Sequence, residues 1–251
     1  MVALIDLTSL LFVMFSSIAV VLASGSSGNS KVGLLEALPE IGIFGMYAGL
    51  IIMMSNMYDP ANLPPAIAVA FMPILYASII GFAVVSMLST DDESEVSDAS
   101  WRPIVGVAIF LATISAIFYE HAAALLIPEA ALVVAVLIAI CLGAQRFSGR
   151  NDPSQVFSLL PSIGLLTGGM GLILALINIS DPKSVGPALA ISVGGIMYTS
   201  LIKMLWLLLR PGNVQQPEGA SPVIDWAPAR SAFVGVSILI VALSFSLSDL
   251  G

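Results

Sequence analysis

One stretch of the chain, from Leu38 to Ser78, recurs without a gap from Leu160 to Ser200, at an offset of about 122 residues. Each copy runs from an apolar segment through a polar Asn/Asp-Pro turn into a second apolar segment. This order predicts a helical hairpin, so the chain holds two hairpins and the segments that frame them. The matched positions pair Pro39 with Pro161, Gly42 with Gly164, Gly49 with Gly171, Asn56 with Asn178, Asp59 with Asp181, Pro60 with Pro182, Pro65 with Pro187 and Tyr76 with Tyr198.

The composition places these hairpins in a membrane. Of 251 residues, 58% are hydrophobic and only 10% are charged, and the mean hydropathy is +1.04. About 20 apolar residues in a helix cross the roughly 30 Å of hydrocarbon in a bilayer. A β-barrel strand would alternate apolar and polar residues, which a run such as Ala131–Leu142 does not. The sequence therefore predicts an all-α integral membrane protein, and the net charge of −8 argues against nucleic acid as a partner.

The distribution of basic residues predicts the orientation in the membrane. Seven of the eight lie in or beside the segments 24–31, 89–102, 146–153 and 210–228, which makes these segments cytoplasmic by the positive-inside bias. Both termini and both Asp-Pro turns then face outward, and the expected location is the cell (inner) membrane. The helices that these segments separate are about eight in number and are expected near residues 3–23, 33–56, 62–88, 103–120, 123–145, 154–178, 184–209 and 229–248.

An even number of helices in each half gives the two copies the same orientation. We therefore expect residues 1–120 and 121–251 to form two parallel four-helix repeats, related by an axis along the membrane normal. Gene duplication is the simplest origin of such an arrangement.

The order of the motif residues points to a known family. The second copy supplies Pro161, Gly164, Gly171-Leu172-Ile173, Ser180-Asp181-Pro182, Val185-Gly186-Pro187, Ala190 and Tyr198, and the first supplies Pro39, Gly42, Gly45, Gly49-Leu50-Ile51, Asp59-Pro60, Pro65, Ala68, Ala70 and Tyr76. In this order the hairpin resembles the last two membrane helices of the MotA/TolQ/ExbB proton-channel family. The resemblance implies a ring of subunits around the single membrane helix of a MotB- or ExbD-like partner. That partner carries the Asp that takes up the ion, and ion flow drives rotation or force transfer.

Several features depart from the family pattern. The family has a large cytoplasmic domain before the hairpin, whereas the cytoplasmic linkers here are short. The small hydroxyl position after the Gly-rich step is Met46 in one copy and Gly168 in the other, and Thr167 lies one residue early. The Thr-rich step of the second helix is replaced by Pro73-Ile74 and Gly195-Ile196. These departures favour a shared fold over an active ion-driven stator.

The first candidate surface consists of glycines at helical spacing. Such small residues let helices approach closely in lipid, so they predict either a face for partner helices or packing within this chain. Pro39 and Pro161 either bend their helices, in the conformational coupling that the resemblance implies, or begin them. The six glycines are Gly42, Gly45, Gly49, Gly164, Gly168 and Gly171.

The ionisable residues are the second set of candidates. Glu40 is the ion-path candidate, because an ionisable group in a membrane helix is a candidate for function by default. The alternative is a solvated carboxylate at the membrane interface. Asp59 and Asp181 each precede a proline, which suits a turn and a helix cap, with ion entry as the alternative.

Other polar residues have more ordinary readings. The cluster of Glu120, His121 and Glu129 favours a polar hairpin tip, and with no second His in the chain a metal site is not expected. The hydroxyls of Tyr76 and Tyr198 need hydrogen-bond partners, in this chain or in a neighbouring subunit.

Three function hypotheses remain open. The chain lacks a phosphate-binding loop, CxxC, HExxH and a recognisable Ser/Cys–His dyad, so we expect neither an enzyme nor a cofactor. The first hypothesis is a MotA/TolQ/ExbB-like membrane subunit, an oligomer or complex member that forms part of an ion-driven motor or proton channel. The second is a small-solute transporter with two parallel repeats. The third is a scaffold or accessory subunit of a larger membrane complex.

Overall fold

The computed structural model describes residues 6–25, 28–55, 63–86, 101–147, 153–177 and 182–209, and no strand occurs among them. Seven helical segments in these ranges are long and apolar enough to cross a membrane. The expected helix near 229–248 lies outside the described residues. In chain order the elements are α1 (Leu7–Ser24), α2 (Gly28–Ser55), α3 (Leu63–Ala70), α4 (Met72–Ser86), α5 (Arg102–Phe118), η3 (Tyr119–His121), α6 (Ala122–Leu125), α7 (Pro128–Phe147), α8 (Pro153–Ile177) and α9 (Pro182–Leu209).

Two of the expected helices are interrupted. The helix expected near 62–88 divides at Phe71, because Pro73 lacks an N–H and its ring crowds the carbonyl four residues earlier. The N–H of Phe71 bonds the carbonyls of both Ile67 (3.3 Å) and Ala68 (3.2 Å), which tightens the chain at the break. The helix expected from residue 123 begins instead at Pro128, a favourable first helical position, after η3 and α6.

Local interactions explain where α1 begins and ends. The carboxylate of Asp6 accepts a hydrogen bond from the N–H of Ser9 (2.8 Å) and so caps the start of the helix. Gly25 follows the end with a φ of 86°, a conformation that other residues rarely adopt. The helix therefore ends sharply enough for α2 to begin at Gly28.

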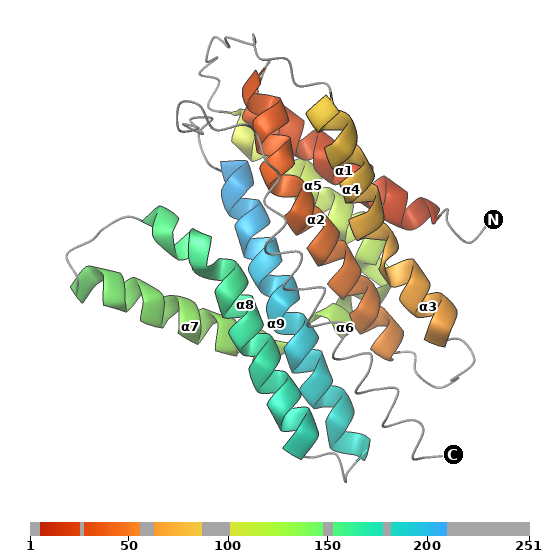
Figure 1. The fold of residues 1–251 in the computed structure, drawn as a ribbon, viewed down its shortest axis with the longest axis vertical. Helices are drawn as coiled ribbons and strands as arrows, with labels where there is room; N and C mark the ends of the chain where they lie inside the picture. The colour runs from red at the N-terminus through yellow and green to blue at the C-terminus, as the bar shows by residue number, and fades with distance from the viewer. Residues whose placement is uncertain are drawn as a thin grey trace.

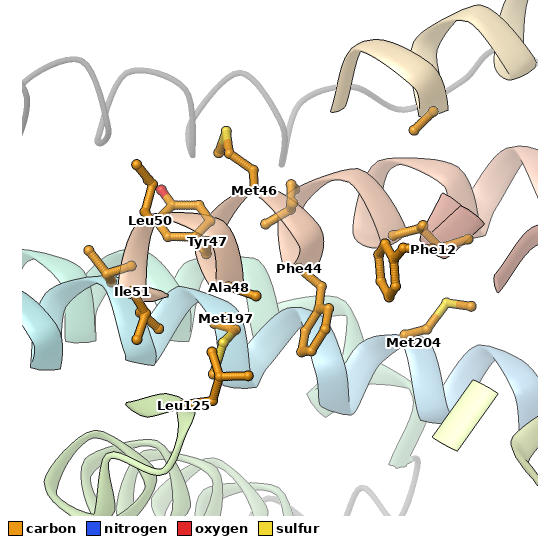
Figure 2. Packing of buried hydrophobic residues seen from close by; sticks show 14 of the residues in the cluster. Phe12, Phe44, Met46, Tyr47, Ala48, Leu50, Ile51, Leu125, Met197 and Met204 are labelled. Atoms are coloured by element: carbon orange, nitrogen blue, oxygen red, sulfur yellow. The ribbon is translucent and has the colours of Figure 1, made fainter. Parts of the chain in front are cut away.

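The two most buried spans, α2 and α9, lie side by side in the centre of the molecule (Figure 1). In this view α7 and α8 lie on one side of the central pair, and α1, α3 and α4 lie on the other. Figure 2 shows Phe44, Ala48 and Ile51 projecting from α2 toward α9, where Met197 and Met204 meet them, whereas Met46 projects away. All six side chains are buried. The α2–α9 contact is thus the apolar seam between the first hairpin, α2 with α3 and α4, and the second, α8 with α9.

The outer surface of the helices is apolar as well. Large side chains such as Phe82 on α4, Leu132 and Ile140 on α7, and Leu166 and Ile173 on α8 are exposed. A water-soluble monomer rarely exposes so much apolar area, whereas lipid contact requires it. This surface agrees with the apolar composition of the seven candidate spans.

Candidate functional site between the hairpins

All six candidate glycines contact the second helix of their own hairpin. A side chain at Gly45 would collide with Pro73, and one at Gly168 would meet Ile196 at 3.2 Å. The remaining four form two matched sets, in which the glycine and the residue that it faces are both displaced by the repeat offset. Gly42 faces Ile74 and Ala77 as Gly164 faces Ile196 and Thr199, and Gly49 faces Ala70 as Gly171 faces Ser192.

One contact between the hairpin helices occurs at equivalent positions in both hairpins, but the small and the larger residue have exchanged helices. In the first hairpin Gly45 of α2 leaves room for Pro73 of α4. In the second hairpin the equivalent positions are Thr167 of α8 and Gly195 of α9, and Thr167 occupies the space beside Gly195. A small residue thus faces a larger one in both hairpins, on opposite helices. The helices approach closely in both cases because one of the two side chains is absent.

Pro39 and Pro161 lie inside α2 and α8 rather than at their starts. The reading of these residues as helix-start prolines is therefore wrong. Each proline lacks the N–H that would bond the carbonyl four residues earlier, which for Pro39 is the carbonyl of Leu35. In α2 this interruption lies immediately before Glu40.

Glu40 is buried and forms an ion pair across the seam between the hairpins. Lys203 of α9 donates a hydrogen bond from Nζ to Oε1 of Glu40 at 2.7 Å. The Glu40 side chain is 3% exposed and the Lys203 side chain is 22% exposed. The structure therefore differs from the solvated interfacial carboxylate that was the alternative reading, because the long stem of Lys203 brings its ammonium group inward to Glu40 instead of toward solvent.

Two buried serines on α1 lie at the level of this ion pair. The register of α1 on α2 is fixed at two points: the rings of Phe12 and Phe44 are 5.8 Å apart, and a side chain at Gly33 would meet Ser24. Between these points the antiparallel helices place Ser16 and Ser17 level with Glu40. Both hydroxyls are buried and have no hydrogen-bond partner among the described residues. By this register the two hydroxyls and the ion pair lie at the same level of the bundle.

Tyr76 and Tyr198 have hydrogen-bond partners within the chain. The backbone N–H of Asp6, at the start of α1, donates to the hydroxyl of Tyr76 (3.0 Å). Similarly, the N–H of Ile127, before α7, donates to the hydroxyl of Tyr198 (2.8 Å), which itself donates to the carbonyl of Leu125 (2.7 Å). Each tyrosine thus joins the second helix of a hairpin to the start of the helix that precedes that hairpin.

The hydroxyls on α8 and α9 that could line an ion path also bond within the chain. Thr167 donates to the carbonyl of Ile163 (3.0 Å), Thr199 donates to that of Ile196 (2.9 Å), and Ser192 donates to that of Gly168 across the hairpin (2.7 Å). All three hydroxyls therefore donate to backbone carbonyls, and the bond of Ser192 joins the two helices of the hairpin. Among the described residues no group of three or more His, Cys, Asp or Glu side chains is arranged to hold a metal ion.

Several candidates cannot be placed in this site. Asp59, Pro60 and Asp181 lie outside the described residues. Pro182 begins α9, and Pro65 and Pro187 fall within α3 and α9. Glu120 and His121 lie in η3, and Glu129 lies in the first turn of α7.

Comparisons with protein families, with curated proteins and with solved structures gave no match for this chain.

Sequence reasoning missed the partners in this site. Lys203, Ser16 and Ser17 are not among the candidate residues that the sequence pattern indicates. A signal was present, since Glu40 and Lys203 are charged residues within two apolar spans, and such residues commonly pair with one another. Only the packing of α2 against α9 shows that these two residues meet.

Proposed function

We propose that this protein is a MotA/TolQ/ExbB-like integral membrane subunit that assembles with other membrane proteins and whose own helices serve as a scaffold. The observation that carries the proposal is the ion pair of Glu40 with Lys203. A carboxylate that relays ions must exchange them, whereas this one is neutralised by a cation tethered to the same chain. The bonding of the Thr167, Ser192 and Thr199 hydroxyls to backbone carbonyls supports the same conclusion.

Two parallel repeats form part of the proposal. The first helices of the two hairpins end at Ser55 and Ile177, which are separated by the offset of the sequence repeat. The matched glycine contacts and the similar bonds of Tyr76 and Tyr198 also support it. The duplicated unit would comprise the preceding helix, the hairpin and one following helix, which in the first half are α1, α2 to α4, and α5.

The membrane setting is proposed from the apolar spans and from the distribution of charge. We place the protein in the cell (inner) membrane, with both termini outside the cytoplasm. A single-helix protein of the MotB or ExbD type is one partner that the resemblance suggests. The exposed apolar faces of α7 and α8 offer area for another membrane protein as well as for lipid.

Purification from the native membrane tests the assembly. The protein would be isolated in mild detergent and the accompanying proteins identified by mass spectrometry, with a mock purification as control. We expect membrane proteins in a fixed ratio to this chain. Recovery of the chain alone, at native expression and in several detergents, would contradict the proposal.

Ion flux tests the scaffold role. Liposomes that contain only this protein would be loaded with a pH-sensitive dye and given a potassium diffusion potential. We expect proton flux equal to that of empty liposomes, for the wild-type protein and for Glu40→Gln. Flux above that level in the wild-type protein that falls in Glu40→Gln, but not in the exposed Glu129→Gln, would overturn the scaffold role and restore Glu40 as an ion-path residue.

A further inference from the structure

A cavity of about 650 Å³ lies beside the first hairpin, away from the ion pair. Its walls come from α1, α2, α3, α4, the end of α5, and η3. Along α2 it extends from Gly45 to Met53, a rise of about 12 Å at 1.5 Å per residue. Volumes of about 300–1,000 Å³ are typical of small-molecule sites, so the cavity is large enough for a small molecule with a short apolar chain.

The lining of this cavity includes features that are particular to the first hairpin. Gly45 and Gly49 lie in its wall, and the helix divides at Phe71, beside the lining residue Pro73. Because Pro73 lacks an N–H, the carbonyl of Val69 in the wall has no donor from the regular helix pattern. In the second hairpin Thr167 stands at the position equivalent to Gly45, and α9 continues unbroken past Gly195.

The polar and apolar groups of the cavity occupy different walls. Polar side chains gather at the start of α1, where Asp6, Thr8 and Ser9 lie, and on η3, where Glu120 and His121 lie. The lining residues from α2, α3 and α4 are apolar, as are Phe12 and Phe118. Such a division suits a molecule with a polar head and an apolar body.

The charge of the polar wall indicates the sign of the head. Asp6 and Glu120 are the two acidic residues of the lining, and no Lys or Arg occurs among the described residues that line the cavity. A cationic head would be attracted to this wall, and an anionic one repelled.

We propose that this cavity binds an amphiphile with an ammonium head and a single apolar chain, the head between the start of α1 and η3 and the chain against α2, α3 and α4. The proposal goes beyond the scaffold function and does not depend on it. The apolar lining selects the chain, and the two acidic residues select the head.

Binding of decyltrimethylammonium to the protein in lipid nanodiscs tests the proposal, with empty nanodiscs as the reference for partition into lipid. We expect saturable binding to the wild-type protein. Asp6→Asn and Glu120→Gln should each weaken it about tenfold, which corresponds to the loss of one favourable charge interaction of ~1.4 kcal/mol. Asparagine retains the helix cap of Asp6. Glu129→Gln, a neutralisation near the same bend that does not line the cavity, should leave the affinity within about twofold.

Ligands that share only one part of the probe separate the head from the chain. Decyl sulfate and decyl maltoside should not compete, and neither should tetramethylammonium. Ala66→Phe, which fills the apolar wall, should abolish binding while circular dichroism and gel filtration remain unchanged. Equal competition by decyl maltoside would reduce the cavity to an acyl-chain site, and equal competition by tetramethylammonium would make it a small-cation site; either result would overturn the proposal. The absence of saturable binding to the folded wild-type protein would also overturn it.

Discussion

The ion pair between Glu40 and Lys203 makes the stability of the helix bundle depend on two charges that must be present together. Lys203→Met would leave the Glu40 carboxylate buried without its cation, and Glu40→Gln would leave the ammonium of Lys203 beside a neutral amide. Removal of one member of a buried pair costs about 3–5 kcal/mol, because the remaining charge loses its compensation. The replacement of both by apolar residues of similar volume is often neutral, or stabilising by about 1–4 kcal/mol.

The different burial of the two side chains sets the order of these effects. With its side chain 3% exposed, Glu40 has no route to solvent, so Lys203→Met should reach about 4–5 kcal/mol. Lys203 is 22% exposed and has a flexible stem that can carry the ammonium toward the interface, so Glu40→Gln should cost only about 2–3 kcal/mol. The double variant Glu40→Met/Lys203→Met should return to within about 1 kcal/mol of the wild type.

Thermal unfolding in one detergent measures all three variants. For a chain of 150–250 residues, 1 kcal/mol corresponds to roughly 2–4 °C in Tm, so Lys203→Met should lower Tm by roughly 8 °C or more. Arg146→Met removes an exposed charge from the last turn of α7 and should cost less than about 1 kcal/mol. The reasoning is refuted if both single variants lie within about 0.5 kcal/mol of the wild type, or if the double variant equals the sum of the single ones.

Three further predictions use the same unfolding assay. Tyr198→Phe removes the bonds to Ile127 and Leu125 and should cost about 1–3 kcal/mol, whereas Tyr119→Phe, at an 80% exposed residue, should stay within about 0.5 kcal/mol; equal effects would contradict the role of Tyr198. Gly171→Ala places a methyl group about 2.6 Å from the Cα of Ser192 and should cost more than about 2 kcal/mol. Gly169→Ala, in open space, should stabilise the protein by about 0.5–1 kcal/mol, and a reversal of the two signs would refute the packing. Ser16→Ala removes a buried hydroxyl without a partner and should be neutral or stabilising, whereas Ser192→Ala loses the bond to Gly168 and should cost about 1 kcal/mol. If Ser16→Ala costs more than about 1 kcal/mol, the hydroxyl of Ser16 has a partner and the prediction is wrong.

The helices were predictable because each depends mainly on local sequence. Apolar runs and polar turns placed α1, α2, α5, α8 and α9 within a few residues of their observed ends. The break at Phe71 was not predicted, although Pro73 was visible, because a proline in an apolar run either kinks a helix or divides it according to the packing around it. The late start of α7 at Pro128 has a similar cause, since the residues before it form the short η3 and α6 instead of a continuous helix.

The site was less predictable because it joins residues distant in sequence. Glu40 and Lys203 are separated by 163 residues and meet only because α2 packs against α9. Similarly, chemistry alone predicts that the hydroxyl of Tyr198 needs a hydrogen-bond partner. That the partners are Leu125 and Ile127 is known only from the position of α6 beside α9. Spacing along one helix predicts which residues share a face. Which two faces contact each other can be known only from the arrangement of the helices.

The reversed contact at Gly45 offers a direct test of whether the two hairpins are structurally equivalent. A side chain at Gly45 would lie 2.6 Å from the Cβ of Pro73 and 3.0 Å from the ring of Phe12. Gly45→Thr should therefore cost about 2–3 kcal/mol, at the upper end of overpacking in a core. In the second hairpin Thr167 occupies the same place without such a collision, because Gly195 faces it.

Pro73→Gly should then rescue Gly45→Thr, since the pair reproduces the second hairpin. The ring of Phe12 must still shift by a few tenths of an ångström, so we expect a partial recovery, with a favourable coupling of about 1–2 kcal/mol in a double-mutant cycle. Pro73→Leu is the matched control, because it removes the proline but leaves a large side chain opposite position 45, and it should give no rescue. If Pro73→Gly and Gly45→Thr are additive within about 0.5 kcal/mol, the two contacts are not interchangeable, and the similarity of the hairpins is limited to the glycines that they share.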